Sequence, residues 1–146
     1  MFIQLVIATL MVLVTVIIHL VGLAVLVRIL RSHSRLFQSP RILPISLLIG
    51  AAMGIVAIHT VEIWVYALLY DGIGAFRTFE EALYFSTVTY STIGYGDVVM
   101  RREWRILGSI EGANGILMLG WSTAFLVSLL SQLRLLGHDW LSRGKD

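Results

Sequence analysis

The 146-residue chain contains no cysteine, and charged residues make up only 14% of it. Without cysteine, neither a disulfide nor a thiolate metal site can form. Soluble domains carry about a quarter of charged residues, whereas 58% of this chain is hydrophobic, so its composition indicates a membrane protein. The formal net charge of +2 is too small to indicate a nucleic-acid partner.

Three apolar stretches are long enough to cross a bilayer, which requires roughly 20 apolar residues. They lie at about residues 2–27, 42–70 and 106–136. The first is unlike a signal peptide, because it has no positive start, is too long and lacks a small-residue cleavage site. We therefore expect an N-terminal transmembrane helix within residues 1–30, followed by a basic link at 31–41.

A shorter helix is predicted between the second and third stretches, at residues 78–91. It starts with Thr78-Phe79-Glu80-Glu81, a capping box in which the Thr78 hydroxyl and the Glu81 carboxylate satisfy exposed N–H groups. A helix of about 13 residues is roughly 20 Å long, which is too short to span a membrane. Such a segment is tolerated at membrane depth only when protein buries it or when it lines water.

The six residues that follow, Thr-Ile-Gly-Tyr-Gly-Asp at 92–97, form the most informative motif of the chain. Glycine adopts positive φ without a Cβ clash, so Gly94 and Gly96 allow successive carbonyls to point toward one axis. The segment resembles the selectivity filter of the potassium channel family, usually Thr-Val-Gly-Tyr-Gly-Asp. The resemblance covers a pore domain at 42–136, with an outer helix at 42–70, a pore helix at 78–91, a filter at 92–97 and an inner helix at 104–136, leaving a cytoplasmic tail at 137–146.

This resemblance implies an all-α membrane protein with three transmembrane helices, a re-entrant pore helix and an extended selectivity filter. It also implies passive, selective conduction of K⁺ through rings of backbone carbonyls that replace the hydration shell of the ion. The expected ion-binding residues are Thr92, Ile93, Gly94, Tyr95 and Gly96. Because four loops surround one ion and this chain has a single loop without an internal repeat, we predict a homotetramer.

Relatives in this family also imply which residues support the filter. Asp97 is expected behind the filter mouth, held by an aromatic residue of the pore helix, for which Tyr84 is the candidate. Many relatives have a pore-helix carboxylate where this chain has Val88, so fewer hydrogen bonds would brace the filter. We therefore expect its stability to depend more on Tyr84, Thr87 and Tyr90.

The third apolar stretch is expected to line the cavity below the filter. Four of its residues share one face at helical spacing: Leu117, Gly120, Ala124 and Ser128. Gly112 and Gly115 lie where relatives bend the inner helix to open. The alternative is that these glycines let helices pack closely in the membrane.

Charged residues inside a membrane span are costly and are therefore functional candidates. Glu62 follows His59 by one helical turn, and Asn114 follows Glu111 in the same way. We expect Glu111 and Asn114 to contact the pore helix or the second helix, with the His59 and Glu62 pair participating. Such a network could couple pH to the filter, although a static cluster that fixes helix packing is the favoured interpretation.

Basic residues predict the orientation in the plasma membrane. Seven of the 11 Lys and Arg residues lie in the 28–41 region or from Arg134 to the end of the chain, and the other four lie near the filter. The positive-inside rule then places the N-terminus outside and the C-terminus in the cytoplasm. Trp64, Tyr66 and Tyr70 are expected to form, with Trp104, an aromatic belt at the outer interface.

Other functions are compatible with parts of this pattern. A less selective cation channel is the nearest alternative, and a non-conducting subunit that modulates a partner channel is another. An enzyme is not expected, because the sequence has no nucleophile-base constellation, metal-ligand cluster or nucleotide loop. No cofactor is expected, and no metal other than K⁺ as the permeant ion.

Overall fold

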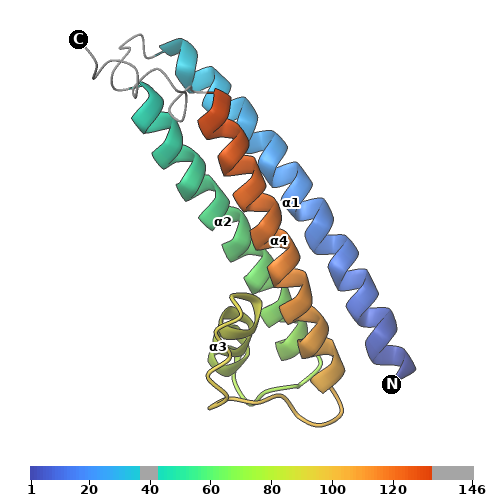
Figure 1. Cartoon of the computed structure of the whole chain (residues 1–146). Coiled ribbons are helices and arrows are strands. Elements are labelled where there is room, and N and C mark those ends of the chain that lie inside the picture. The colour runs from blue at the N-terminus through green and yellow to red at the C-terminus, as the bar shows by residue number, and fades with distance from the viewer. Residues whose placement is uncertain (37–42, 133–146) are drawn as a thin grey trace, which may run out of the picture.

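Four helices make up the part of the chain that the computed structural model describes, residues 1–36 and 43–132 (Figure 1). They are α1 (Phe2–Leu36), α2 (Leu43–Gly72), α3 (Phe79–Tyr90) and α4 (Arg105–Gln132). No strand occurs among these described residues, so the all-α prediction is confirmed. The predicted tail at 137–146 lies outside them, as do residues 37–42 of the link and 133–136 of the inner helix.

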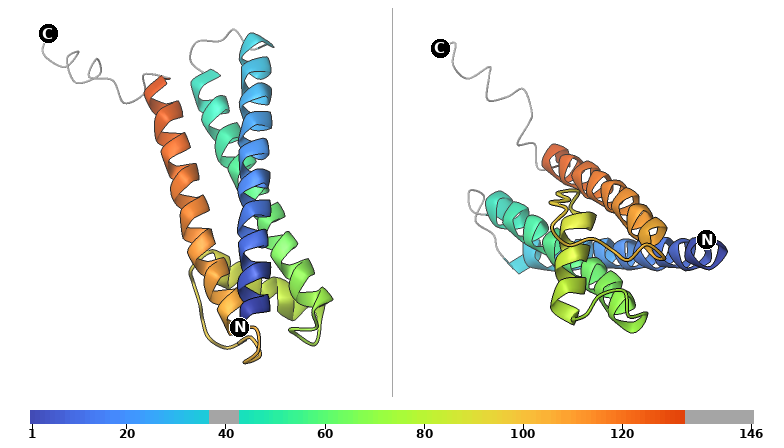
Figure 2. Two further views of the ribbon diagram at one scale, coloured as in Figure 1. Left: turned by 90° about the vertical axis from the view of Figure 1, so that its right-hand side faces the viewer. Right: turned by 90° about the horizontal axis from the view of Figure 1, so that it is seen from below.

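Three of the helices, α1, α2 and α4, are long and apolar enough to cross a membrane. They run side by side, whereas the short α3 lies at the end of the bundle that also holds the N-terminus (Figures 1 and 2). The α1 helix continues to Leu36, beyond the predicted boundary at residue 30. No glycine or proline interrupts residues 24–36, so the basic segment that was assigned to the link extends the helix instead.

The start of α3 has the predicted cap. The Thr78 hydroxyl accepts a hydrogen bond from the Glu81 backbone N–H at 3.2 Å. The Glu81 carboxylate reaches back to the N–H of Arg77 at 3.0 Å. Because two exposed donors are satisfied in this way, the helix begins at Phe79 although it has only 12 residues.

The α1 helix packs against α2 and α4 along a single stripe of its surface. The stripe is spaced by three or four residues, so its members share one face of the helix: Ala8, Met11, Thr15, His19, Leu23, Leu26 and Leu30. Toward its C-terminal end the stripe joins an apolar cluster with Leu47, Ala51 and Ile55 of α2. The middle of the stripe is polar, which places Thr15 and His19 inside the bundle instead of in lipid.

Glycines allow two close approaches between helices. A Cβ added at Gly54 would lie 2.3 Å from a methyl carbon of Leu26, where α1 meets α2. A Cβ at Gly115 would lie 2.1 Å from the backbone oxygen of Tyr90, where α4 crosses the end of α3. Small residues at such positions let membrane helices pack closely. The packing alternative therefore accounts for Gly115, one of the two candidate hinge residues.

We predict that Gly115→Ala destabilises the protein, because the backbone of Tyr90 cannot move aside as a flexible side chain can. Overpacking of this kind costs about 1–3 kcal/mol. The matched control is Gly112→Ala, whose Cβ would meet Thr89 at an ordinary 3.6 Å. Thermal unfolding in detergent should show a lower midpoint for Gly115→Ala only. Equal midpoints for the two variants would contradict the close approach.

Candidate functional site

The segment after α3 has an unusual alternating backbone. Thr92, Gly94 and Gly96 have φ angles of 63°, 56° and 79°, whereas Ile93 and Tyr95 between them have negative φ. Positive φ is uncommon for a residue with a branched Cβ, so Thr92 is held there by its surroundings. The N–H of Thr92 donates to Thr89 O and that of Gly94 donates to Val88 O, both at 3.0 Å.

All of residues 92–97 are exposed on the single chain. The side chain of Tyr95 is 70% exposed and that of Ile93 is 53% exposed, in contrast to Tyr90, which is buried two residues before the segment. Added Cβ atoms at Gly94 and Gly96 would meet nothing within 4 Å. One side of the segment is thus attached to α3 and the other side is open.

Asp97, the last residue of the segment, is hydrogen-bonded to α3. The Tyr84 hydroxyl donates to Asp97 Oδ2 at 2.8 Å. This hydrogen bond lowers the pKa of the Asp97 carboxyl below its ordinary value. The same bond raises the pKa of the Tyr84 hydroxyl. The donor and acceptor are those expected from the sequence, and both side chains are exposed on the single chain.

The other three residues that were expected to support the filter have different environments. The Thr87 hydroxyl donates to Leu83 O within α3, so it is turned toward its own helix. Val88 has a buried side chain, and its carbonyl is the acceptor for Gly94. The Tyr90 side chain extends away from the filter and donates to the Glu62 carboxylate.

Glu111 of α4 is a buried junction between three helices. Its carboxylate accepts from the Ser86 hydroxyl of α3 and from the Tyr70 hydroxyl of α2, both at 2.6 Å. Ser86 Oγ also lies 2.9 Å from Ile63 O of α2. These contacts with the pore helix and the second helix are those that the sequence analysis expected for Glu111.

Glu62 of α2 is a second junction, and it also reaches α1. Its two carboxylate oxygens lie 3.0 Å from His19 Nδ1 and 3.1 Å from His59 Nδ1. Tyr90 of α3 donates to the same carboxylate. Ser122 Oγ of α4 lies 3.0 Å from His59 Nε2, so all four helices meet at this cluster.

Asn114 joins a third set of contacts between the spans. Its amide donates to Thr15 Oγ1 at 2.8 Å and to the Tyr66 hydroxyl oxygen at 3.3 Å. It therefore connects α4 to α1 and α2. The whole network connects each span to the others through polar side chains in an otherwise apolar bundle.

The residues that were expected to line the cavity lie on the open face of α4. All four are exposed on the single chain: Leu117, Gly120, Ala124 and Ser128. An added Cβ at Gly120 would meet nothing within 4 Å. The face that they share is thus largely exposed among the described residues.

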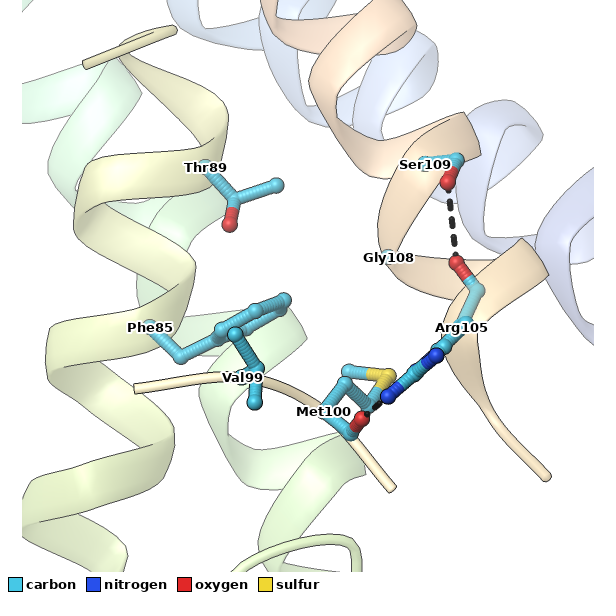
Figure 3. Close-up of a pocket in the computed structure, with 7 residues that line it drawn as sticks. All are labelled: Phe85, Thr89, Val99, Met100, Arg105, Gly108 and Ser109. Atoms are coloured by element: carbon cyan, nitrogen blue, oxygen red, sulfur yellow. Dashed lines mark hydrogen bonds between the residues drawn. The ribbon is translucent and has the colours of Figure 1, made fainter. Parts of the chain in front are cut away.

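An open cleft of about 500 Å³ lies between α3 and α4, behind the filter segment (Figure 3). It is lined by Phe85, Thr89, Val99, Met100, Arg105, Gly108 and Ser109. Arg105 Nε donates to Met100 O at 3.4 Å, and this bond connects the start of α4 to the loop that follows the filter segment. The lining combines four apolar or glycine residues with the polar side chains of Thr89, Arg105 and Ser109.

Sequence reasoning missed several members of the polar network. Tyr66 and Tyr70 were expected in an aromatic belt at the interface, but both are fully buried and hydrogen-bonded inside the bundle. The belt prediction is wrong for these two residues. His19 and Ser122 were not assigned to the cluster. The sequence feature that could have indicated their burial was their helical spacing from other residues, since both lie on helix faces that carry further small or polar residues.

Comparison with protein families matches residues 51–132 to the ion channel family. The match covers more than half of the chain, including α3, the filter segment and α4, so the protein belongs to this ion channel family. It is a multi-pass membrane protein that serves ion permeation. No curated protein and no solved structure matches the chain.

We predict that Tyr84→Phe raises the pKa of Asp97 toward that of an ordinary aspartate, because the bond that lowers it is removed. The stability that this bond contributes is present above the ordinary carboxyl pKa of about 3.9 and is lost as the pH falls through the lowered value. Carbon-13 NMR of labelled aspartates should measure the shift, with the other aspartates as internal references. An unchanged Asp97 titration would contradict the contact.

Proposed function

We propose that this ion channel is selective for K⁺ and conducts it passively through the segment Thr92–Gly96. The observation that carries the proposal is the alternation of φ along this segment. Alternation of right-handed and left-handed conformations makes successive N–H groups converge on one side. The alternating sign of φ along this segment fits that pattern. Because each peptide unit is planar, its C=O then points to the other side.

The hydrogen bond from the Gly94 N–H to Val88 O identifies the N–H side as the side that faces α3. The carbonyls would accordingly line the open side, where they can replace the water shell of K⁺. The Thr92 hydroxyl would add the innermost layer, and Gly96 allows the chain to turn outward. In addition, the negative C-terminal end of α3 lies directly before the filter, where it favours a cation.

A homotetramer is the assembly that we propose for this channel. One chain supplies one carbonyl to each ring, and four loops surround a K⁺ ion in filters of this kind. The exposed filter side chains and the exposed face of α4, with Leu117, Gly120, Ala124 and Ser128, would be covered by neighbouring copies or would line the cavity. Gly112 has only ordinary contacts, which leaves it as the remaining hinge candidate.

We infer an orientation with the N-terminus outside and the C-terminus in the cytoplasm. The N-terminus and α3 lie at one end of the bundle, and the opposite end holds Arg28 and Arg31 (Figure 1). The positive-inside rule favours the cytoplasm for the end with more Arg and Lys. The filter would then lie near the outer face of the cell membrane.

Two alternative functions make different predictions from this proposal. A less selective cation channel would lack the Tyr95 filter pattern, so the intact pattern favours K⁺. A modulatory subunit would not need the alternating backbone at all. Both are outcomes of the flux measurement below.

We predict that the purified protein in liposomes gives K⁺ flux well above Na⁺ flux, and that Gly94→Ala lowers the K⁺ flux. A side chain in the left-handed region costs roughly 1–2 kcal/mol, and four copies would share one pore. Since about 1.4 kcal/mol is a factor of ten, K⁺ flux should fall by more than about tenfold.

The matched control for this measurement is Gly74→Ala. Gly74 has a φ of 63° and also has nothing within 4 Å of an added Cβ, but it lies in the α2–α3 loop. Its variant carries the same backbone cost and should keep K⁺ selectivity. Equal K⁺ and Na⁺ flux in the wild type would point to the less selective channel, and no flux would favour the modulatory subunit. An equal loss of K⁺ flux in Gly94→Ala and Gly74→Ala would refute the assignment of ion conduction to the filter segment.

We also predict that native mass spectrometry of the detergent-purified protein shows four copies of the chain. The filter supplies no complete ring of carbonyls with fewer copies, because each chain has one pore loop. A dimer or monomer as the main species at the concentrations that support flux would contradict the fourfold pore.

A further inference from the structure

The cluster around Glu62 brings polar side chains from all four helices together. It contains His19 of α1, His59 and Glu62 of α2, Tyr90 of α3 and Ser122 of α4, all of which are buried. One ligand atom from each of His19, His59 and Glu62 lies within 4.8 Å of the others. The filter proposal uses none of these atoms.

Four donor atoms converge on one side of the cluster. The Nδ1 atoms of His19 and His59 lie 3.0 and 3.1 Å from the Glu62 carboxylate. Tyr90 Oη is bonded to that carboxylate and lies 3.0 Å from His59 Nδ1. Ligands at about 2.0–2.1 Å from a tetrahedral Zn²⁺ are roughly 3.4 Å apart. The contacts of 3.0–3.1 Å in this cluster, which involve both Glu62 oxygens, are close to that spacing.

On the other side of the cluster, the Nε2 atoms of both rings face one hydroxyl. Ser122 Oγ lies 3.0 Å from His59 Nε2 and 3.4 Å from His19 Nε2. If both Nδ1 atoms carry the ring proton, this hydroxyl can donate to only one Nε2, and the other is left without a partner. If an ion binds both Nδ1 atoms, both Nε2 atoms carry protons, and the Ser122 oxygen can accept both bonds. Histidine ligands of metals are usually oriented by such a partner.

Charge also favours an ion at this depth in the membrane, where a net charge is costly. A divalent ion held by the Glu62 carboxylate and by a deprotonated Tyr90 oxygen would be balanced by these two negative ligands, with both imidazoles neutral. Binding of the ion would release the proton of the Tyr90 hydroxyl.

We propose that this cluster is a metal site for a divalent transition ion, with Zn²⁺ as the best fit. The ligands are His19 Nδ1, His59 Nδ1, the Glu62 carboxylate and Tyr90 Oη. Two imidazoles with oxygen donors in a tetrahedral arrangement suit Zn²⁺, whereas Ca²⁺ and Mg²⁺ prefer oxygen ligands alone. A proton shared by the two imidazoles is the rival occupant of this cluster, and the metal measurements below distinguish the two occupants.

The ion would lock three helices together next to the filter. Its ligands come from α1, α2 and α3, and Tyr90 is the last residue of α3, two residues before Thr92. This assignment gives α1 a specific function, which is to supply the ligand that closes the site. The proposed metal site departs from the expectation of no metal other than K⁺. The proposal does not depend on whether the filter conducts K⁺.

The test measures metal in the full chain, purified in detergent with its affinity tag removed. After growth in zinc-supplemented medium, elemental analysis should find about one Zn²⁺ per chain. Exchange with Co²⁺ should produce the intense visible absorption of a tetrahedral ion. X-ray absorption at the zinc edge should show nitrogen and oxygen ligands at about 2.0–2.1 Å and no sulfur. Absence of retained Zn²⁺, or the weak absorption of six-coordinate Co²⁺, would overturn the proposal without need of any variant.

Matched variants then identify the ligands. His19→Gln should weaken Zn²⁺ binding at least as much as loss of a supporting partner does, which is about 10–100-fold. Tyr90→Phe should weaken it as well and abolish the tetrahedral Co²⁺ spectrum. His33→Gln is the control, because position 33 is on the same helix about 21 Å farther along. Equal Zn²⁺ affinity in wild type and His19→Gln, or an equal loss in His33→Gln, would refute the assignment.

Discussion

Two buried carboxylates, Glu62 and Glu111, hold the short helix α3 between the membrane spans. A 12-residue helix cannot cross the bilayer, so it remains at membrane depth only when the surrounding protein satisfies its polar groups. Ser86 bonds to Glu111, and Tyr90 bonds to Glu62. Both hydroxyls and both carboxylates are buried, so each carboxylate fixes where its part of α3 lies.

The position of α3 in turn determines the position of the filter segment. Gly115 allows the backbone of α4 to approach Tyr90, and the carbonyl of Val88 receives the N–H of Gly94. One edge of the filter is therefore attached to the end of a helix that is itself attached to two spans. The opposite edge of the filter segment is exposed among the described residues, and it is the edge that the proposed pore would cover with further copies.

Much of this arrangement could be predicted from the sequence, but only where one segment determines its own structure. The lengths of the apolar runs predicted three spans, and Thr78 predicted the start of α3, because caps and helix lengths are local properties. The burial of Tyr66 and Tyr70 is not local. It depends on which face of α2 meets its neighbours, and in a membrane protein the lipid-facing and protein-facing sides are both apolar, so the pattern of hydrophobic residues does not distinguish them. The role of His19 in the cluster was not predicted for the same reason, because its partners come from other helices.

The two carboxylates differ in the charges that their neighbours can carry. Glu111 is bonded to two hydroxyl groups, Ser86 and Tyr70, neither of which can become positive. Glu62 lies between two imidazoles, which can accept a proton or bind a cation. Any cation at Glu62 also acts on Tyr90, the last residue before the filter turn, whereas Glu111 acts on the middle of α3. Glu62 is thus the carboxylate at which a bound cation can reach the filter, and Glu111 is the one that keeps α3 in place whatever occupies the other site.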